Sequence, residues 1–273
     1  LNVGFILLAT IMIYPLILVL GVSITDEQAL ISSSYSWFPS DISFKAYELL
    51  FKLNKGIVNA YAVTIIVTIG GTLLSLLVIG LYAYPLSRKD LKYRNTFAFI
   101  AFFTMLFSGG LIPWYLVCTQ YLHLQNSIWA LILPFVMNAF HVIVLRTFFS
   151  TSIPMEILES AKIDGSGELR TFLTIVIPLS LPGLATIAIF TSVTYWNDYY
   201  LPLMLVNDPA LYNLQYLIYK VLSNIEVLKN NSQVVADLRS SGIATPENST
   251  RMALAVITVG PIIFVYPYLQ KYF

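Results

Sequence analysis

A short charged segment between two long apolar runs holds the residues whose spacing is most informative. It reads Glu-Ser-Ala-Lys-Ile-Asp-Gly over residues 159–165, and Ile-Val-Ile-Pro follows at 175–178. Glu156 and Glu159 lie where acids stabilise the N-terminal part of a helix, and Gly165 can take the left-handed conformation that ends one. We interpret this polar elbow as a docking surface for a partner protein in the cytoplasm.

Two helices are expected to form this elbow. Thr151 and Ser152 precede Ile-Pro at 153–154, where hydroxyls can cap a first helix and proline is tolerated in its first turn. The first helix is amphipathic and is expected to end at Gly165. Ser166 is expected to cap a second helix, and the apolar stripe of that helix consists of Leu169, Phe172, Leu173 and Val176. An ordinary solvated connector would account for this periodicity alone.

The composition indicates an integral membrane protein. Of the 273 residues, 58% are hydrophobic and 11% are charged, whereas soluble domains have about 25% charged residues. Charge-free runs are long enough for helices of about 20 residues, which cross a bilayer, and their continuity favours a helical bundle over a β-barrel. We predict one transmembrane domain over 1–273, with spans at approximately 1–24, 57–84, 96–120, 128–149, 179–206 and 252–271.

The positive-inside rule predicts the orientation of these spans. Residues 88–94 carry four basic side chains and one acid, so this short loop is expected in the cytoplasm. Both termini and the loop 150–178 are then cytoplasmic, whereas loops 25–56 and 207–251 lie outside. Because the sequence begins with Leu1 and stops soon after the last span, we expect both cytoplasmic tails to continue beyond it.

The sequence lacks the signatures of catalysis. It has no G-x-x-x-x-G-K-[ST] loop for nucleotide phosphates, no G-x-S-x-G elbow and no His/Glu cluster for a metal, and His123 and His141 lie far apart. The single cysteine, Cys118, has no partner for an intrachain disulfide. We therefore expect no catalytic residue, no metal and no cofactor on this chain.

Polar and aromatic side chains gather in the fifth predicted span, where they could line a path for a hydroxyl-rich solute. This run includes Tyr195, Trp196, Asn197 and Asp198. An alternative is that the run belongs to an aromatic belt at the outer interface, because Asp198 lies about 30 Å along a helix from Pro178. Asn138 and His141 in the fourth span are further candidates, with helix-packing hydrogen bonds as the alternative.

The pattern E-x-A-x-x-x-G-x(9)-I-x-[LI]-P over residues 159–178 resembles the EAA loop of permease subunits in binding-protein-dependent ABC importers. The resemblance covers nearly the whole chain and is greatest to the maltose-type carbohydrate permeases. It implies an all-α membrane protein with the six-transmembrane-helix fold of a type I importer and a cytoplasmic coupling helix-turn-helix. Ser160 and Ile177 replace the usual alanine and leucine, and both changes are conservative in size. The coupling residues implied by the motif are Glu159, Ala161, Asp164 and Gly165.

The resemblance also implies a function and a set of partners. The chain would be the transmembrane subunit of an ATP-driven importer in the bacterial inner membrane, translocating an oligosaccharide or polysaccharide fragment. Its partners would be a second, related permease in a heterodimer, two ATPase subunits that bind ATP and magnesium, and an extracellular solute-binding protein, with no nucleic acid. An importer of another solute class, or a membrane sensor that translocates nothing, is the alternative.

Two outer loops could meet the binding protein. Residues 25–56 look like the family's first outer loop, and residues 207–251 include an apolar, tyrosine-rich portion at 211–228 that is expected to be helical. The alternative for both loops is that they only pack over the bundle.

Overall fold

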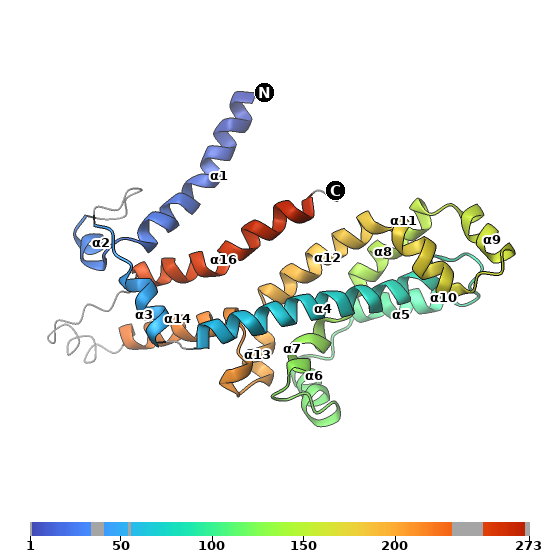
Figure 1. Ribbon diagram of the computed structural model, residues 1–273. Helices are drawn as coiled ribbons and strands as arrows, with labels where there is room; N and C mark the ends of the chain where they lie inside the picture. Colours follow the sequence, from blue (N-terminus) through green and yellow to red (C-terminus); the bar gives the residue numbers. More distant parts are fainter. Residues whose placement is uncertain (1, 34–40, 54–55, 231–247, 271–273) are drawn as a thin grey trace. The chain divides into compact units, whose positions relative to one another are not determined.

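Helices are the regular elements of the described chain (Figure 1). An isolated β-bridge joins Thr25 and Ile42. The computed structural model describes residues 2–33, 41–53, 56–230 and 248–270. Parts of the two predicted outer loops lie outside the described residues, namely 34–40, 54–55 and 231–247.

The chain divides into two compact units by its internal contacts. Unit 1 comprises residues 1–61 and 213–266, and unit 2 comprises residues 62–212 and 267–273. The boundary falls within one long helix, α4 (Gly56–Ser87). The single transmembrane domain stays a prediction.

Unit 1 has a small apolar core. Ala46 and Leu50 of α3 pack with Ile57 of α4 and with Ala253 and Leu254 of α16, and apolar residues of α14 cover this cluster. Helix α14 confirms the expectation of a helix within 211–228. The helices assigned wholly to this unit or ending just beyond it are α1 (Asn2–Ser23), α2 (Glu27–Ser33), α3 (Lys45–Leu53), α14 (Leu214–Asn230) and α16 (Asn248–Gln270).

A buried carboxylate joins α2 to the first turn of α16. The side chain of Glu27 accepts hydrogen bonds from the backbone N–H of Asn248 at 3.0 Å and of Ser249 at 2.9 Å. It also accepts bonds from the Asn248 amide at 3.2 Å and the Ser249 hydroxyl at 2.7 Å. The first N–H groups of a helix lack partners within it and carry partial positive charge, so a carboxylate satisfies them well.

Unit 2 contains the predicted elbow, most of the predicted second span and the predicted third to fifth spans. Its core has one cluster around Tyr195, Leu131 and Leu201, and another around Ile79, Val142 and Val176. After α4, its helical elements are α5 (Arg94–Leu106), α6 (Leu111–Leu116), η1 (Val117–Tyr121), α7 (Ile128–Ile132), η2 (Leu133–Phe135), α8 (Ala139–Ser152), α9 (Met155–Ile163), α10 (Glu168–Thr171), η3 (Phe172–Val176), α11 (Ile177–Leu179), α12 (Leu181–Trp196), α13 (Tyr200–Leu205) and η4 (Pro209–Leu211).

Three predicted spans are not straight helices. The chain bends by 114° between α5 and α6, where Gly110 takes a φ of +88° that side chains disfavour. It bends by 54° before α8, where the Asn138 side chain accepts the N–H of Phe140 and begins a new helix. A third bend, of 82°, lies at Ser180 between α11 and α12, and the span expected at 179–206 is interrupted again between Trp196 and Tyr200.

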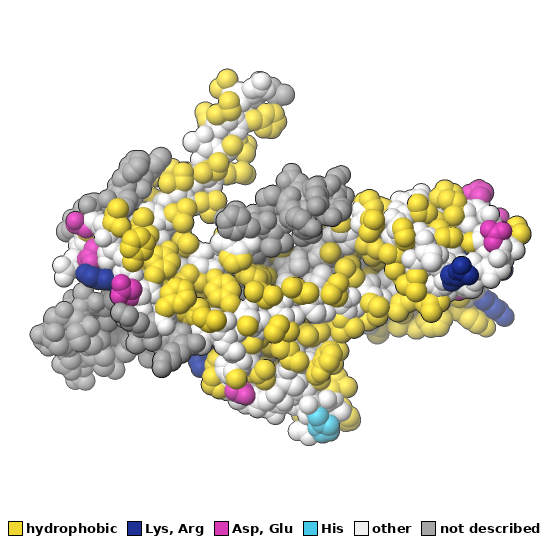
Figure 2. Space-filling model, viewed as in Figure 1, with side chains coloured by type: hydrophobic (Ala, Val, Ile, Leu, Met, Phe, Trp, Pro, Cys, Tyr) yellow, Lys and Arg dark blue, Asp and Glu magenta, His cyan; other side chains and the backbone are white. Residues whose placement is uncertain are grey.

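Long apolar helices agree with a membrane location. Among the described residues, α1 and α4 can each cross a bilayer by length and composition, and the count for this part of the chain rises to five if each bent pair is one span. The predicted sixth span coincides with α16 up to Gln270, but residue 271 is not described. Figure 2 shows hydrophobic side chains spread over the exposed face of unit 2 and charged ones gathered at the end where α9 lies.

Candidate functional site

The elbow has the geometry that its glycine predicts. Helix α9 ends at Ile163, and Gly165 follows with a φ of +78°. The Ser166 N–H donates to the carbonyl of Ala161 at 2.9 Å, and the Gly165 N–H donates to the carbonyl of Lys162 at 3.1 Å. This pair of bonds is the Schellman arrangement, which satisfies the last carbonyls of a helix and requires a residue that tolerates positive φ. The predicted end of the first helix is confirmed.

The two faces of α9 differ in exposure. Leu158 and Ala161 are buried, whereas Glu156, Glu159 and Asp164 are exposed. Ile163, at the end of the helix, is 86% exposed. Charged side chains beside an exposed aliphatic group suit a protein contact, because the apolar group gains from burial and the charges set the orientation. The role of Glu159, Ala161, Asp164 and Gly165 in coupling stays a prediction.

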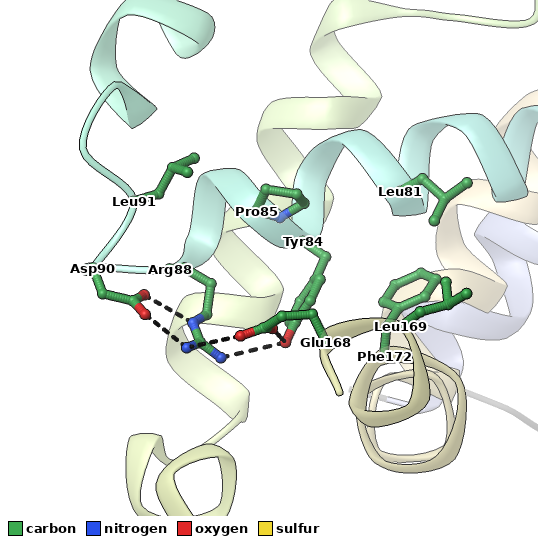
Figure 3. A pocket seen from close by; sticks show the side chains of 9 residues that line it. All are labelled: Leu81, Tyr84, Pro85, Arg88, Asp90, Leu91, Glu168, Leu169 and Phe172. Atoms are coloured by element: carbon green, nitrogen blue, oxygen red, sulfur yellow. Dashed lines mark hydrogen bonds and ion pairs between the residues drawn. The ribbon is translucent and has the colours of Figure 1, made fainter. Parts of the chain in front are cut away.

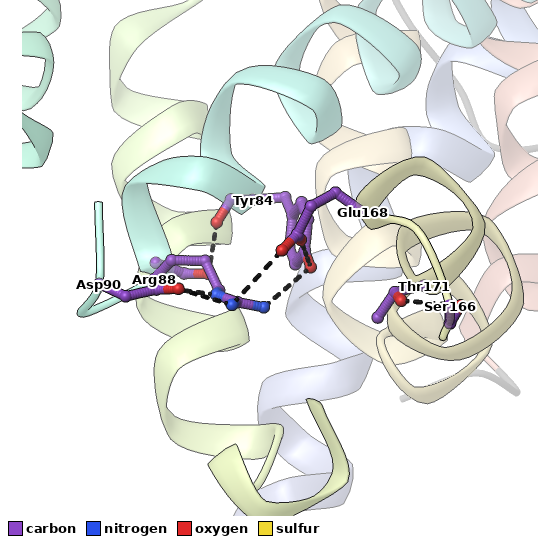
Figure 4. Close-up of polar contacts among 7 residues, drawn as sticks. Tyr84, Arg88, Asp90, Ser166, Glu168 and Thr171 are labelled. Atoms are coloured by element: carbon purple, nitrogen blue, oxygen red, sulfur yellow. Dashed lines mark hydrogen bonds and ion pairs between the residues drawn. The ribbon is translucent and has the colours of Figure 1, made fainter. Parts of the chain in front are cut away.

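Two details of the predicted elbow are wrong. Thr151 does not cap α9: its hydroxyl bonds back to the carbonyl of Thr147 at 2.9 Å within α8, and Pro154 precedes α9 without a side-chain cap. Ser166 does not cap the second helix, because α10 begins after Gly167. The Ser166 hydroxyl instead accepts a bond from Thr171 at 3.1 Å (Figure 4). In both places serine and threonine hydroxyls find local partners other than the expected N–H groups.

A polar cluster joins the elbow to the end of α4, and sequence analysis missed it. Tyr84 donates its hydroxyl hydrogen to Glu168 Oε2 at 2.9 Å, and Arg88 Nη2 lies 3.5 Å from Glu168 Oε1 (Figure 4). Arg88 also holds Asp90 through two bonds, Nε to Oδ1 at 2.9 Å and Nη2 to Oδ2 at 2.8 Å. The sequence analysis counted Arg88 only as a charge that sets orientation. The long separation of Tyr84 and Glu168 along the chain leaves no local signal for their pairing.

The electrostatics of the Arg88–Asp90 pair favour its ionised form. The Arg88 guanidinium lowers the pKa of Asp90 to about 2, and Lys162 of α9 makes a smaller contribution in the same direction. The pKa of Arg88 is raised above its ordinary value, chiefly by the hydrogen bond to Asp90. Both groups therefore remain charged at neutral pH, and their paired, two-bond geometry is the strongest form of such a contact.

An open pocket lies beside this cluster. Figure 3 shows that the cluster's side chains form one wall and that apolar side chains complete the lining. The lining residues come from the end of α4, the connection to α5, and the α10–η3 segment: Leu81, Tyr84, Pro85, Arg88, Asp90, Leu91, Glu168, Leu169 and Phe172.

The candidates from the fifth predicted span come together where α12 ends and α13 begins, and two of them have clear structural partners. Tyr195 is 1% exposed, and its hydroxyl donates to the Ile132 carbonyl at 2.8 Å. Asp198 is buried, and its Oδ1 accepts the N–H groups of Tyr200 at 2.9 Å and Leu201 at 3.2 Å, which caps α13.

The other candidates for the solute path differ in exposure. Trp196 is buried, whereas Asn197 is exposed and its amide donates to the Val193 carbonyl at 3.1 Å. Asn138 is exposed and caps α8, and His141 is buried with its ring stacked on Phe190 at 6.0 Å between centroids. Contact of these residues with a solute stays a prediction.

Comparisons with known proteins cover the whole chain. Residues 5–273 match the family described as "Binding-protein-dependent transport system inner membrane component". The chain is 41% identical over 271 residues to the polygalacturonan/rhamnogalacturonan transport system permease protein YtcP of Bacillus subtilis, spanning 99% of this chain and 92% of that protein. It is 37% identical over 263 residues to the protein LplC of Bacillus subtilis, spanning 96% and 86% respectively.

A solved structure has a similar fold. It is described as the crystal structure of a bacterial ABC transporter involved in the import of the acidic polysaccharide alginate. It matches with a TM-score of 0.85 at 31% identity and covers 100% of this chain and 94% of the other. This likeness confirms the predicted all-α membrane fold, whereas the positions of the six spans stay a prediction.

Proposed function

Since the chain belongs to the family of inner membrane components of binding-protein-dependent transport systems, we propose that it is the transmembrane subunit of an ATP-driven carbohydrate importer. The chain is a multi-pass membrane protein and a transporter subunit rather than an enzyme. The sugar would be an oligosaccharide or polysaccharide fragment, delivered by an extracellular solute-binding protein. Relatives named for polygalacturonan/rhamnogalacturonan transport and for melibiose, raffinose and stachyose import support this substrate class.

The observation that carries the proposal is the exposed elbow at residues 155–168. A helix of nine residues presents acidic side chains and Ile163 at one end of unit 2, and Gly165 fixes the reversal that follows. We assign this surface to an ATPase subunit, which would bind ATP and magnesium. The assembly would contain two such ATPases and a second, related permease. Residues 88–94 and 150–178 and both termini would then be cytoplasmic.

Exposed aromatic rings near the end of α12 support a carbohydrate as the transported solute. Tyr199 and Tyr200 are 46% and 38% exposed, and the ring of Tyr200 lies 5.9 Å from that of Trp114 on α6. Ring faces of this kind can stack on sugar rings. These three residues extend the candidate solute path beyond Tyr195 and Asp198, whose polar groups bond within the protein.

An exposed tyrosine on α14 supports a contact with the binding protein. Tyr219 is 43% exposed and stacks on the buried ring of Tyr216 at 6.4 Å between centroids, and the Lys220 ammonium lies 5.9 Å from the Tyr216 ring. Tyrosine supplies large contact area at a small cost in side-chain entropy, which is why it is frequent at protein interfaces. We place α14 at the outer surface, within reach of the binding protein.

The mechanism is a coupled change of conformation. Binding of ATP closes the two ATPases, the elbow follows the ATPase surface, and the helices attached to it move the conduit between inward-open and outward-open states. ATP and the loaded binding protein drive uptake only if both bind the outward-open state more tightly than the inward-open state.

Reconstituted vesicles test this function. The chain, its related permease and the ATPase are incorporated together, and uptake of labelled neutral and acidic oligosaccharides is measured with ATP and the binding protein. Uptake that stops when ATP, the ATPase or the binding protein is omitted supports the proposal. Uptake of an amino acid or inorganic anion instead would favour another solute class, and assembly with no uptake of any solute would favour a sensor.

A further inference from the structure

The last two turns of α4 contact both segments that flank α9. On one side, Arg146 of α8 donates its Nε hydrogen to the Leu86 carbonyl at 3.1 Å. On the other side, Glu168 of α10 receives the Tyr84 hydroxyl at 2.9 Å and lies 3.5 Å from Arg88. Helix α4 is far from the elbow in the sequence. These contacts nevertheless connect it to both neighbours of α9, so a displacement of α9 can be passed directly to α4.

The groups of this contact at the end of α4 are buried and held in place, whereas the carboxylate from the elbow is exposed to solvent. Arg88 is 9% exposed, and its two bonds to Asp90 fix the orientation of the guanidinium. Arg88 Nη1 also donates to the Tyr84 hydroxyl oxygen at 3.3 Å, which orients the group that bonds to Glu168 (Figure 4). The Glu168 side chain is 65% exposed. A prearranged pair at the end of α4, Tyr84 and the Arg88 that follows the helix, therefore receives one carboxylate from the elbow.

An apolar contact accompanies the polar one. The ring of Phe172 lies 5.3 Å from that of Tyr84 between centroids. A Cβ added at Gly80 would lie 3.3 Å from Phe172 Cζ, so this ring sits closely against the backbone of α4. Phe172 begins the π-helical segment η3, where the wider turn is often found at functional positions. The α10–η3 segment is thus seated on α4 by both a ring and a carboxylate.

We propose that Tyr84 and Arg88 are positioning residues that hold Glu168, so that movement of the elbow reaches α4 as well as α12. The covalent chain runs from the elbow through α11 into α12, and it supplies one route to the conduit. The Glu168 cluster supplies a second route, and loss of it leaves ATPase docking intact while weakening the movement of α4. This inference rests on the proposed transport function.

The test compares solute moved per ATP hydrolysed in reconstituted vesicles for Tyr84→Phe, Glu168→Ala and the double variant. Tyr82→Phe is the matched control, because the Tyr82 hydroxyl donates at 3.0 Å to the Phe97 carbonyl of α5 rather than to the elbow. Glu168→Gln, which keeps an oxygen acceptor of the same shape, shows whether the charge is needed. Co-purification of the ATPase with each variant measures assembly.

We expect each single variant to keep the ATPase bound and to lower the ratio of uptake to ATP hydrolysis by about tenfold, as for loss of one hydrogen bond to a charged group. The double variant should be no worse than the poorer single variant, because both remove the same contact. Glu168→Gln should recover part of the ratio, and Tyr82→Phe should leave it unchanged. Multiplicative losses in the double variant, an unchanged ratio in both single variants, or an equal loss in Tyr82→Phe would overturn the proposal.

Failure of the proposed function gives a different result. In that case the unmodified chain moves no solute with ATP, whereas failure of this inference leaves unmodified uptake intact. If Glu168→Ala does not fold, Tyr84→Phe and Glu168→Gln still decide the matter, because Tyr84→Phe only removes the hydroxyl of a buried ring and Glu168→Gln keeps the shape of an exposed side chain.

Discussion

Gly71 of α4 lies directly against the ring of Tyr195 of α12. A Cβ added at Gly71 would come within 2.5 Å of Tyr195 Cζ, closer than atoms in real structures approach. The Tyr195 ring is buried, and its hydroxyl is tied to the Ile132 carbonyl, so the ring has little room to move away. The close crossing of α4 and α12 in unit 2 therefore depends on the absence of a side chain at position 71.

The first prediction is that Gly71→Ala destabilises the protein. The added methyl group forces the ring or the helix to shift, at a cost of about 1–3 kcal/mol. Thermal unfolding in detergent measures this cost. Gly70→Ala is the matched control, because a Cβ there would be 3.9 Å from Ile132 Cδ1, an ordinary contact. Equal unfolding temperatures for the two variants would show that the crossing tolerates a side chain.

The second prediction concerns the turn that ends α9. Gly165→Ala places a Cβ in the left-handed region, at a cost of roughly 1–2 kcal/mol, although the space around the residue is open. We expect weaker co-purification of the ATPase with little change in overall unfolding, because the strain is confined to the elbow. Gly167→Ala is the control: its φ is −70° and its surroundings are equally open. If both variants retain the ATPase equally, the conformation of Gly165 is not important for docking.

Part of this site could be predicted from the sequence. Glycine after an amphipathic helix predicts a reversal, and the Schellman bonds at Gly165 confirm it. Ser166 was assigned the wrong role, since a hydroxyl beside a turn has several local partners within reach and the pattern alone does not choose among them. The Tyr84–Glu168 bond could not be predicted, because it depends on how two distant segments pack.

The membrane helices, too, could be predicted only in part from the sequence. Apolar runs identified the segments that form α4, α5, α8 and α12, but hydrophobicity along a run says little about its straightness. The bend near Gly110 has a signal in the sequence Ser-Gly-Gly at 108–110, because paired glycines often mark a turn. The interruption after Trp196 has a weaker signal in the sequence, because Asn197 and Asp198 also fit a polar solute path. Only the hydrogen bonds of Asp198 in the structure show its capping role.

The third prediction separates that capping role from solute binding. Asp198→Ala removes the acceptor for two N–H groups and should cost about 1 kcal/mol, the usual value for loss of an N-cap. Asp198→Asn keeps an oxygen at the same place and should be close to the unmodified protein in thermal unfolding. Uptake measured at several sugar concentrations tests the alternative role in solute binding. A raised KM in Asp198→Asn with unchanged stability would indicate that the carboxylate contacts the solute.

The fourth prediction concerns the anchor in unit 1. Glu27→Ala leaves the first N–H groups of α16 without their carboxylate and should destabilise this unit by about 3 kcal/mol. Glu27→Gln should have a smaller effect, because one oxygen remains. Hydrogen exchange at the start of α16 measures the change. Asp41→Asn is the control, because Asp41 is an exposed acid of the same unit. Unchanged protection at Ser249 in Glu27→Ala would contradict the anchoring role.

The central claim is that the exposed elbow passes the work of ATP hydrolysis to the membrane helices, and Glu159→Lys tests it most directly. Glu159 is exposed on α9, so reversing its charge alters the docking surface without disturbing the core. Assembly with the ATPase and ATP-dependent sugar uptake are measured together in reconstituted vesicles, with unfolding as a check on the fold. We predict that both fall at least about tenfold, as expected when a favourable charge contact becomes repulsive. Assembly and uptake at the level of the unmodified protein would contradict the account.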